Sequence, residues 1–350
     1  MVRLCVTGAA GFIGSNFVGR VLCDGETGVT VLDALTYAGN LENLGEFESG
    51  VGAERYRFVR GSICDPSAVE DAASDCDAIV NFAAESHVDR SIADPGAFID
   101  ANVHGPRVLM DRAVKSGIRF VQVSTDEVYG SLGPRGLFTE ESPLDPSSPY
   151  AASKAAADLL VNAYVTTFGL DAVITRCGNN YGPRQFPEKL IPLFITNAID
   201  DRELPLYGDG LNVRDWIHVD DHCDAIRAVL EKGATGRVYN ISARGELSNR
   251  EICDRILSLL EKPASLVRYV SDRPGHDRRY ALDASRIAGE LGWQPAVGFE
   301  DGMAQTIDWY RNNRRWWERI KSGEYLDYYD RLYGDRLGRA SGEPVKDGRD

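Results

Sequence analysis

Short apolar runs that alternate with helix-like segments set the strongest limit on how this chain can fold. The first half contains "RLCVTG", "VTVLD", "YRFVRG", "AIVNFAA", "RFVQVST" and "DAVITRC". The segments between them, such as residues 14–22 and 97–116, repeat apolar residues at the 3.6-residue period of a helix. This alternation is typical of βαβ units stacked on one sheet. It predicts an α/β fold with a doubly wound parallel sheet.

After Gly178 the pattern loosens into stretches rich in Pro and Gly, such as "NNYGPRQFPEKLIP" and "ELPLYGDG". We therefore expect a first domain over residues 1–178, to which 211–244 and part of 281–330 return, with "RDWIHV" and "RVYNIS" as strands. Residues 179–210 and 245–280 would form a smaller, mixed α/β substrate-binding domain. Residues 335–350 lack apolar periodicity and are predicted to be a disordered tail.

The net charge of −14 argues against nucleic acid or an acidic membrane as a partner, since a phosphate backbone needs a broad basic face. The seven cysteines are odd in number and scattered, without C-x-x-C spacing, which indicates reduced thiols in a cytoplasmic protein. The chain begins with a predicted strand, and no apolar run approaches the roughly 20 residues of a membrane span. We expect neither a signal peptide nor a membrane anchor.

Aromatic and arginine residues mix in "MAQTIDWYRNNRRWWERI", a composition that could also suggest a nucleic-acid surface. Met303, Ile307, Tyr310 and Trp317 fall at i, i+4, i+7 and i+14, which is one face of a helix. The acidic chain offers no wider basic patch. The segment is therefore predicted to be an amphipathic helix packed on the core.

A glycine-rich turn follows the first predicted strand directly, in "VTGAAGFIGS". Gly8, Gly11 and Gly14 let the chain turn tightly, approach a pyrophosphate without Cβ interference and point a helix N-terminus at it. Asp33 ends the next strand, where a carboxylate binds the ribose hydroxyls of a dinucleotide. No Arg directly follows Asp33, so the Rossmann-type site is predicted to prefer NAD over NADP.

Two further motifs carry polar groups suited to proton transfer. Tyr150 and Lys154 in "SPYAASK" lie at i and i+4, on one face of a helix. The lysine ammonium, together with a positive nicotinamide, is expected to lower the pKa of Tyr150. "STDEVYG" sets Asp126 and Glu127 beside Thr125 at a strand end, and repulsion between adjacent carboxylates separates their pKa values into an acid and a base.

With these motifs the sequence resembles the extended short-chain dehydrogenase/reductase family and, within it, the dTDP-glucose 4,6-dehydratases. The resemblance runs from about Val2 to Tyr329. It covers, in order, "VTGAAGFIGS", "LTYAGN", "NFAAESHVDRSI", "STDEVYG", "SPYAASK", "NNYGP", "FPEKLIP", "RDWIHVDDH", "DRPGHDRRYALD" and "LGW". It implies a lyase of deoxysugar biosynthesis that converts dTDP-glucose to dTDP-4-keto-6-deoxyglucose and water.

The resemblance also implies roles. NAD would take a hydride from C4 while Tyr150 takes the O4 proton and Thr125 hydrogen-bonds nearby. Glu127 would then remove the C5 proton, Asp126 would protonate the leaving C6 hydroxyl, and the hydride would return to C6. The predicted catalytic residues are Thr125, Asp126, Glu127, Tyr150 and Lys154.

The remaining site residues are implied by position in the family's motifs. The cofactor set is Gly8, Gly11, Phe12, Ile13, Gly14, Asp33, Leu35, Thr36, Ser62, Ile63, Phe82, Ala83, Ala84, Ser86, Ala101, Tyr150, Lys154 and Asn180. Ser62 departs from the family, which places an Asp before the Ile against the adenine. The substrate set is Ser86, Thr125, Asn179, Lys189, Leu190, Pro205, Leu206, Tyr207, Arg214, Asn249, Arg273 and His276. A homodimer through a helix bundle is expected from the helical faces of residues 97–116 and 152–168.

Four alternatives remain. The first is a 4-epimerase or decarboxylase on the same fold, which needs no acid beside a base. The second is a GDP-mannose or UDP-sugar dehydratase, although GDP-mannose dehydratases typically have Ser-Glu where this chain has Asp126 and Glu127. An NAD-binding sensor predicts loss of the catalytic set. His218, Asp220 and His222 could ligate a metal, but Asp220 or Asp221 capping the following helix is the simpler interpretation.

Overall fold

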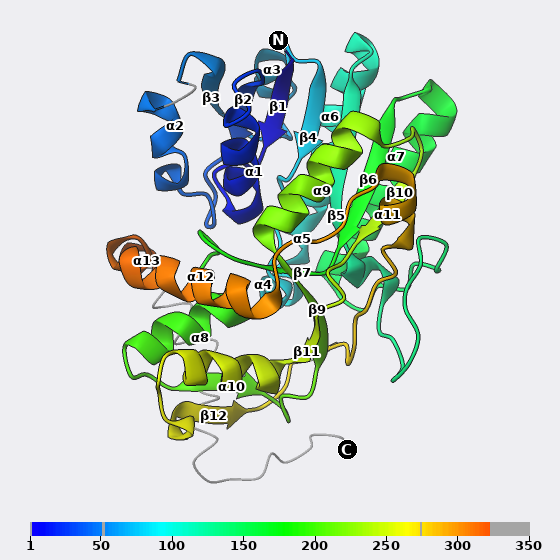
Figure 1. The fold of residues 1–350 in the computed structure, drawn as a ribbon. Coiled ribbons are helices and arrows are strands. Elements are labelled where there is room, and N and C mark those ends of the chain that lie inside the picture. The colour runs from blue at the N-terminus through cyan, green and yellow to red at the C-terminus, as the bar shows by residue number, and fades with distance from the viewer. Residues whose placement is uncertain (1, 51–52, 274, 323–350) are drawn as a thin grey trace.

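The computed structural model describes residues 2–50, 53–273 and 275–322; the predicted tail at 335–350 lies outside the described residues. A seven-stranded sheet dominates the upper half of the molecule, with strand order β10-β6-β5-β4-β1-β2-β3 and parallel pairing throughout (Figure 1). Its strands are β1 (Arg3–Thr7), β2 (Gly28–Asp33), β3 (Tyr56–Arg60), β4 (Ala78–Asn81), β5 (Arg119–Thr125), β6 (Ala172–Cys177) and β10 (Val238–Ile241). The first six coincide with the predicted apolar runs, which confirms the α/β fold class.

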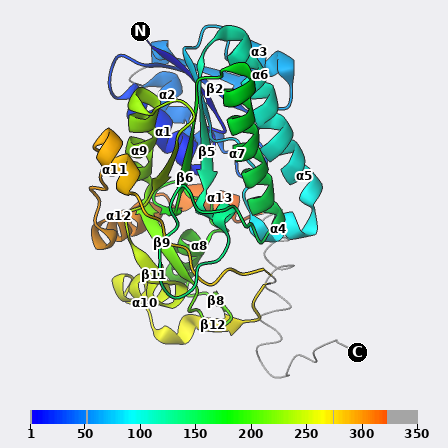
Figure 2. The same ribbon diagram turned by 90° about the vertical axis from the view of Figure 1, so that its right-hand side faces the viewer.

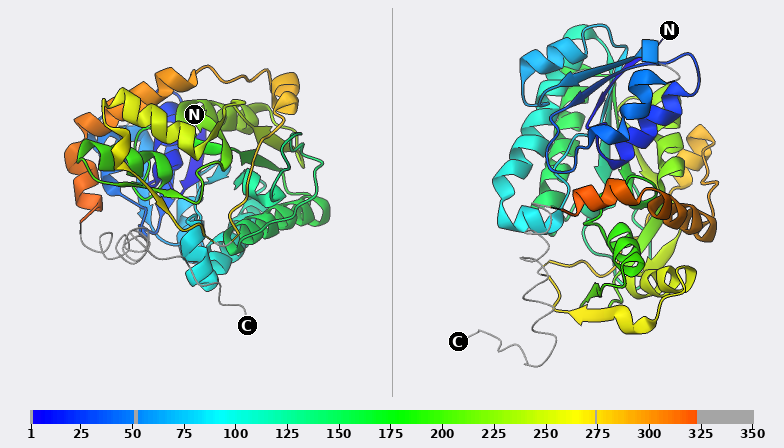
Figure 3. Two further views of the ribbon diagram at one scale, coloured as in Figure 1. Left: turned by 90° about the horizontal axis from the view of Figure 1, so that it is seen from below. Right: turned by 90° about the vertical axis from the view of Figure 1, so that its left-hand side faces the viewer.

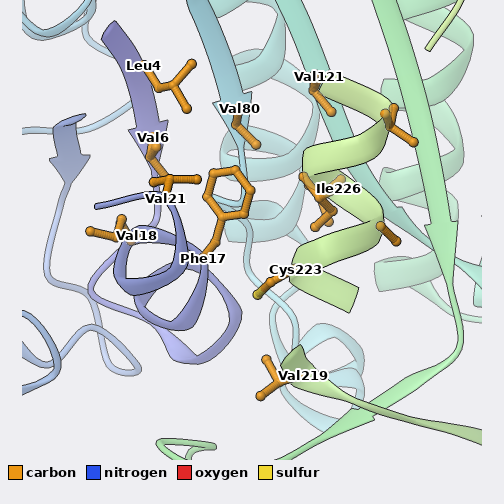
Figure 4. Packing of buried hydrophobic residues seen from close by; sticks show 14 of the residues in the cluster. Leu4, Val6, Phe17, Val18, Val21, Val80, Val121, Val219, Cys223 and Ile226 are labelled. Carbon is orange, nitrogen blue, oxygen red and sulfur yellow. The ribbon is translucent and has the colours of Figure 1, made fainter. Parts of the chain in front are cut away.

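Helices cover both faces of this sheet (Figure 2). One layer holds α1 (Phe12–Leu22), α9 (Val219–Lys232) and α11 (Ser285–Leu291), and the other holds α3 (Pro66–Ala72), α6 (Gly105–Ser116) and α7 (Pro149–Phe168). Strand side chains alternate between the two layers: Leu4 and Val6 pack with α1 and α9 (Figure 4), whereas Cys5 packs on the other side. Because both faces are buried, the strands are apolar throughout.

Shorter elements connect the strands and helices of this unit. They are η1 (Leu41–Asn43), α2 (Gly45–Ser49), η2 (Ala53–Arg55), α4 (Val88–Ala93), α5 (Pro95–Ile99), the π-helical η3 (Asp100–His104) and η4 (Asp126–Tyr129). The predicted helix over residues 97–116 is thus interrupted by a π-helical turn. Asn102 in that turn exchanges hydrogen bonds with the backbone of Glu85 and donates to Ser153 Oγ at 2.9 Å, which fixes the irregular segment.

The smaller unit lies below the carboxyl edge of the large sheet. It contains β7 (Asn179–Tyr181), β9 (Val213–His218) and β11 (Glu246–Ser248) in one sheet, β8 (Leu204–Tyr207) and β12 (Val267–Val270) in another, η5 (Ala264–Leu266), and α8 (Leu190–Ile199), α10 (Asn249–Leu259), α12 (Phe299–Asn312) and α13 (Arg314–Ile320). "RVYNIS" joins the large sheet as predicted, but the same prediction for "RDWIHV" is wrong, since β9 pairs with β7 and β11. At Gly178 a Cβ would lie 2.5 Å from the Asp215 carbonyl oxygen, so glycine there lets β7 leave β6 close against β9.

Two local predictions need correction. Met303, Ile307, Tyr310 and Trp317 are all buried as expected, but they do not share one helix, because Asn313 separates α12 from α13. The Asn313 side chain donates to the Trp309 carbonyl oxygen at 2.9 Å and so competes with the helical backbone.

The cap of α9 differs too. His218, not an aspartate, caps the helix by accepting the Asp220 N–H at 3.3 Å. The Asp221 carboxylate accepts instead from the Ala296 and Val297 N–H groups at 2.9 and 3.0 Å, which ties the segment before α12 to α9. All seven cysteines are free thiols. Within the described ranges, no helix has the length and apolar character to cross a membrane.

We predict that Asp221→Ala lowers the free energy of unfolding by about 2 kcal/mol, because two backbone N–H groups lose a charged acceptor. Urea denaturation followed by circular dichroism measures this change. The matched control is Asp220→Ala, whose half-exposed carboxylate makes only ion pairs at 3.8 Å; its effect should stay within about 0.5 kcal/mol. Equal effects of the two substitutions would contradict this role of Asp221.

Candidate active site

A cavity of about 550 Å³ lies along the carboxyl edge of the large sheet, where β1, β2, β4, β5 and β6 end. It reaches from the glycine-rich turn after β1 to the segment before α8. Parallel strands place all their carboxyl ends at one edge, so residues far apart in sequence meet there.

The glycine-rich turn (residues 8–14) forms one end of the cavity. Gly8 has φ +67°, and a Cβ on it would lie 2.6 Å from the Ala83 Cα. A Cβ on Gly14 would lie 2.7 Å from the Ala9 Cα. Among the residues that the structure describes, no side chain caps the N-terminus of α1, so its first N–H groups are available to an anion. Only glycine permits this close packing of the turn against Ala83 and Ala9, and the N–H groups at the start of α1 fit the pyrophosphate of a dinucleotide.

Asp33 lies beside the turn at the end of β2. Its two carboxylate oxygens accept from the Ala10 and Leu35 N–H groups, each at 2.8 Å, and burial raises its pKa. Each carboxylate oxygen has two acceptor positions, so one on each stays available to ribose hydroxyls. This donor and acceptor set fits NAD.

Most of the predicted cofactor residues line this cavity. They are Gly8, Gly11, Phe12, Ile13, Gly14, Asp33, Thr36, Ser62, Ile63, Phe82, Ala83, Ala84, Ser86, Ala101, Tyr150, Lys154 and Asn180. Leu35 is not among the lining residues; its backbone, at φ +54°, contacts Asp33 instead. Ala101 reaches the wall because it lies in the π-helical turn.

The five predicted catalytic residues line the same cavity. β5 ends at Thr125, whose hydroxyl accepts from the Glu127 N–H at 3.2 Å and donates to the Asp126 carboxylate at 3.2 Å. In the described part of the chain, the second carboxylate oxygen of Asp126 has no hydrogen-bond partner. This oxygen is buried and is the unpaired acceptor of the group.

The adjacent carboxylates differ in their surroundings. Burial, then the charges of Glu127 and Asp215, raise the pKa of Asp126 well above its usual range. Burial also raises the pKa of Glu127, but Arg273, Arg214 and Lys189 counteract this. The surroundings therefore favour the protonated state more strongly for Asp126 than for Glu127, whose neighbours include three cations.

Tyr150 and Lys154 come from the first turns of α7, beside the end of β5. Burial and the charge of Glu127 raise the pKa of Tyr150 well above its usual range, while the Thr125 hydroxyl lowers it. The Lys154 ammonium donates to the Val123 carbonyl oxygen at 2.7 Å, and burial lowers its pKa. The protein alone therefore does not produce the expected lowering of the Tyr150 pKa.

The predicted substrate residues divide into two groups. Ser86, Thr125, Asn179 and Lys189 line the cavity, and Lys189 Nζ donates to the Ser86 carbonyl oxygen at 2.9 Å. The remainder do not line it and come from the smaller unit: Leu190, Pro205, Leu206, Tyr207, Arg214, Asn249, Arg273 and His276. The Leu206 side chain is fully buried in the core of that unit, so it offers only its backbone.

Two residues of this second group, Arg214 and Arg273, still lie near enough to Glu127 to lower its pKa. The Arg214 guanidinium stacks 4.5 Å from the Tyr280 ring centroid and donates to the Asp277 carbonyl oxygen at 3.0 Å. The His276 ring faces the Tyr207 ring at 6.1 Å, and burial, then Arg273 and Arg214, lower the pKa of His276 to about 4. The pocket thus concentrates cations in an acidic protein.

Other lining residues were missed from the sequence, among them Tyr37, Glu85, Cys177, Gln185 and Glu188. Glu188 had a detectable signal, since it precedes Lys189 in "FPEKLIP". Tyr37 lies in "LTYAGN", where nothing in its spacing indicates that its ring contacts the Phe186 ring 5.6 Å away.

The candidate metal ligands have other contacts. His222 Nδ1 lies 2.8 Å from Asn180 Oδ1, and His218 caps α9. Over residues 2–50, 53–273 and 275–322, no group of three or more His, Cys, Asp or Glu side chains is arranged to hold a metal ion.

Known proteins match this chain over nearly its whole length. The family model described as GDP-mannose 4,6 dehydratase matches residues 5–306. Two curated relatives are named dTDP-glucose 4,6-dehydratase. The one from Streptomyces niveus is 53% identical over 92% of this chain and 96% of its own length. The one from Streptomyces griseus is 55% identical over 91% of this chain and 97% of its own length.

Solved structures agree. A dTDP-glucose 4,6-dehydratase from Streptomyces venezuelae, crystallised with NAD and TYD bound, has a TM-score of 0.88 and 54% identity, covering 91% of this chain and all of its own. A UDP-glucose 4-epimerase from Thermus thermophilus in complex with NAD has a TM-score of 0.82 at 31% identity, over 89% of this chain and all of its own. The fold is shared by both enzymes, whereas sequence identity is far higher to the dehydratase.

We predict that Asp126→Asn gains stability relative to the wild type as pH rises. The raised pKa means that folded Asp126 keeps its proton at pH values where Asp126 of the unfolded chain has lost it. The protonated carboxyl group therefore contributes to the free energy of unfolding at low pH, and this contribution is lost as the pH rises toward the pKa of the folded state. The amide has no such loss, and the stability difference should grow by at least about 1 kcal/mol between about pH 5 and about pH 8 in urea denaturation. Exposed Asp145→Asn is the control, and a pH-independent difference for Asp126→Asn would contradict the assignment.

Proposed function

This chain belongs to the dTDP-glucose 4,6-dehydratase family, and we propose from that premise that it converts dTDP-glucose to dTDP-4-keto-6-deoxyglucose in deoxysugar biosynthesis. The observation that carries the proposal is the Asp126–Glu127 pair. Burial raises the pKa of Asp126 well above its usual range, whereas three cations near Glu127 counteract the rise in its pKa. A hydro-lyase needs such an acid beside a base.

NAD fits the glycine-rich turn and Asp33, and when bound it supplies the acceptor, and later the donor, of the hydride exchanged with the sugar. We propose that it is held by the cofactor residues that line the cavity. Tyr150 removes the O4 proton during C4 oxidation, and Lys154, hydrogen-bonded to Val123, keeps a cation beside it. The Thr125 hydroxyl, which lies at Tyr150, orients the same oxygen.

Oxidation at C4 makes the C5 proton acidic, because C5 then lies next to a carbonyl group. Glu127 removes that proton. Asp126, through its unpartnered carboxylate oxygen, gives a proton to the departing C6 hydroxyl. Elimination across C5 and C6 releases water and leaves a double bond between these carbons. Glu127, which holds the proton taken from C5 and can exchange it with water, returns a proton to C5, and return of the hydride from the reduced cofactor to C6 completes the 4-keto-6-deoxy sugar. The residue roles in these steps are proposals that rest on the cavity's geometry and charges.

We propose that the nucleotide diphosphate binds between the two units. Lys189, Arg214 and Arg273 supply cations near Glu127, and Tyr207 and His276 form an aromatic pair in the smaller unit. Cations gathered locally can hold a diphosphate although the net charge is −14. The division into a cofactor domain at 1–178, 211–244 and part of 281–330 and a substrate domain at 179–210 and 245–280 stays a proposal, and β9 within 211–244 pairs with strands of the smaller unit.

The alternatives fit less well. A 4-epimerase uses the tyrosine and NAD but no elimination, and the epimerase compared above is 31% identical against 54% for the dehydratase. The family model is named for GDP-mannose, whereas the curated relatives above, at 53% and 55% identity, are named for dTDP-glucose. The free cysteines and nucleotide-sugar substrate favour the cytoplasm as the working compartment.

The decisive experiment incubates purified protein with dTDP-glucose in heavy water and analyses the product by mass spectrometry. Loss of one water with one deuterium gained at C5 is expected. Parallel reactions with UDP-glucose and GDP-mannose test the nucleotide. Conversion to dTDP-galactose without a change of mass would instead identify an epimerase, and absence of any conversion with NAD still bound would favour a sensor.

We predict that Glu127→Gln still oxidises C4 but does not eliminate water, because the amide cannot remove the C5 proton. Quenched reactions should contain a keto sugar nucleotide lighter than the substrate by two hydrogens, with the rate of dehydrated product reduced by about 100-fold or more. Tyr150→Phe is the matched control, in which no oxidised sugar should form. Product formation by Glu127→Gln at the wild-type rate would remove Glu127 from this role.

We also propose a homodimer through α5, α6 and α7, which lie side by side on one flank of the large sheet (Figure 2). This flank exposes large apolar side chains, including Ile99 (53%), Leu159 (59%) and Phe168 (58%). Exposed apolar patches of this kind mark association surfaces.

We predict that sedimentation velocity finds a dimer for the wild type and a shift toward monomer for Leu159→Lys, since a charge would be buried in the interface. The exposed Leu211 lies in the loop before β9, away from these helices, so Leu211→Lys should leave the dimer intact. A monomeric wild type would refute the proposed assembly.

A further inference from the structure

The C-terminal helices α12 and α13 lie across the junction of the two units (Figure 3, right). Most of their buried side chains belong to the core of the smaller unit. Trp316 also reaches the large unit, because its indole Nε1–H donates to the side-chain oxygen of Asn43 at 2.9 Å. The helix is therefore joined to η1, which lies on the opposite side of the junction.

The other end of the Asn43 side chain contacts the glycine-rich turn. Asn43 Nδ2 donates to the Ala10 carbonyl oxygen at 2.9 Å, and the Asn40 N–H donates to the same oxygen at 3.0 Å. The Ala10 N–H in turn donates to Asp33 at 2.8 Å. Both backbone polar groups of residue 10, between Gly8 and Gly11, are thus held by partners outside the turn.

This connection is largely buried and geometrically defined. Asn43 is 3% exposed and Trp316 8%. The Trp316 ring packs edge-on against the Trp309 ring at 5.0 Å, which fixes the direction of its N–H group. In a low-dielectric interior, such a polar chain favours one arrangement and leaves costly unpaired groups in any other.

We propose that Trp316 is a positioning residue for the cofactor: acting through Asn43, it holds the Ala10 carbonyl group and so preorganises the glycine-rich turn for the pyrophosphate of NAD. This inference rests on the proposed function, because it assumes that NAD binds at the turn. It assigns the C-terminal helices a part in cofactor retention. Retention matters here, since the hydride taken from C4 must return to C6 before the cofactor leaves.

The chain offers a matched control in the next residue. Trp317 is also a buried indole of α13, but its Nε1–H donates to the Tyr310 carbonyl oxygen at 2.9 Å, within the smaller unit. Trp316→Phe and Trp317→Phe each remove one indole N–H and similar ring volume. Only the first removes a bond that leads to the glycine-rich turn.

The test measures the dissociation constant of NAD by titration calorimetry on protein stripped of cofactor. Trp316→Phe should weaken NAD binding by about three- to tenfold, the effect of one buried hydrogen bond, with Trp317→Phe within about twofold of wild type. Less NAD should co-purify with Trp316→Phe, and its kcat at saturating NAD should match wild type, since no catalytic group has moved. Equal NAD affinity of the two variants would overturn the proposal.

A second substitution covers the case in which Trp316→Phe fails to fold. Asn43→Asp keeps an acceptor for the indole but replaces the amide donor to Ala10, so it should weaken NAD binding although the Trp316 contact survives. In the double variant the two losses should be less than additive, because both act on one chain of bonds. Wild-type NAD affinity in Asn43→Asp would overturn the inference alone, whereas a wild-type protein that binds no NAD would overturn the proposed function.

Discussion

Parallel pairing of β1, β4, β5 and β6 is the constraint on which the rest of the molecule depends. It brings the glycine-rich turn, the Thr125–Glu127 segment and the exit toward β7 to one edge, although more than 100 residues of chain separate the first from the last. The buried side chains of both helix layers hold the strands in this order. The site is therefore assembled by sheet topology, and its groups meet without any long loop having to close over them.

Desolvation at that edge separates the roles of two neighbouring carboxyl groups. Asp126 is deeply buried with other acidic groups nearby, whereas Glu127 faces cations from the smaller unit. Chain adjacency alone produces repulsion but does not decide which member keeps the proton. The second unit supplies Lys189, Arg214 and Arg273, so the acid and base are distinguished only after the two units have packed together.

The same dependence between units recurs at the cofactor end. Trp316 reaches the glycine-rich turn through Asn43, and Tyr310 Oη donates to the Gln185 carbonyl group while Gln185 donates to the Asn180 carbonyl oxygen at 2.9 Å. The C-terminal helices thus contact both ends of the cavity wall. Cofactor and substrate surfaces are parts of one packed structure, which suits a reaction that oxidises and reduces the same sugar without releasing its cofactor.

The sequence by itself determined strands β1 to β6 and β10 of the large sheet, the glycine-rich turn, Asp33 and the Tyr150–Lys154 pair, because each depends on local periodicity or on a spacing within one element. Only the tertiary structure decided that β9 joins β7, that His218 caps α9, that the protein itself does not lower the Tyr150 pKa, and that Asn43 links Trp316 to the turn. These outcomes depend on strand partners, burial and contacts between residues up to 273 positions apart. No local pattern encodes them, since their energies arise only when distant segments exclude water from one another.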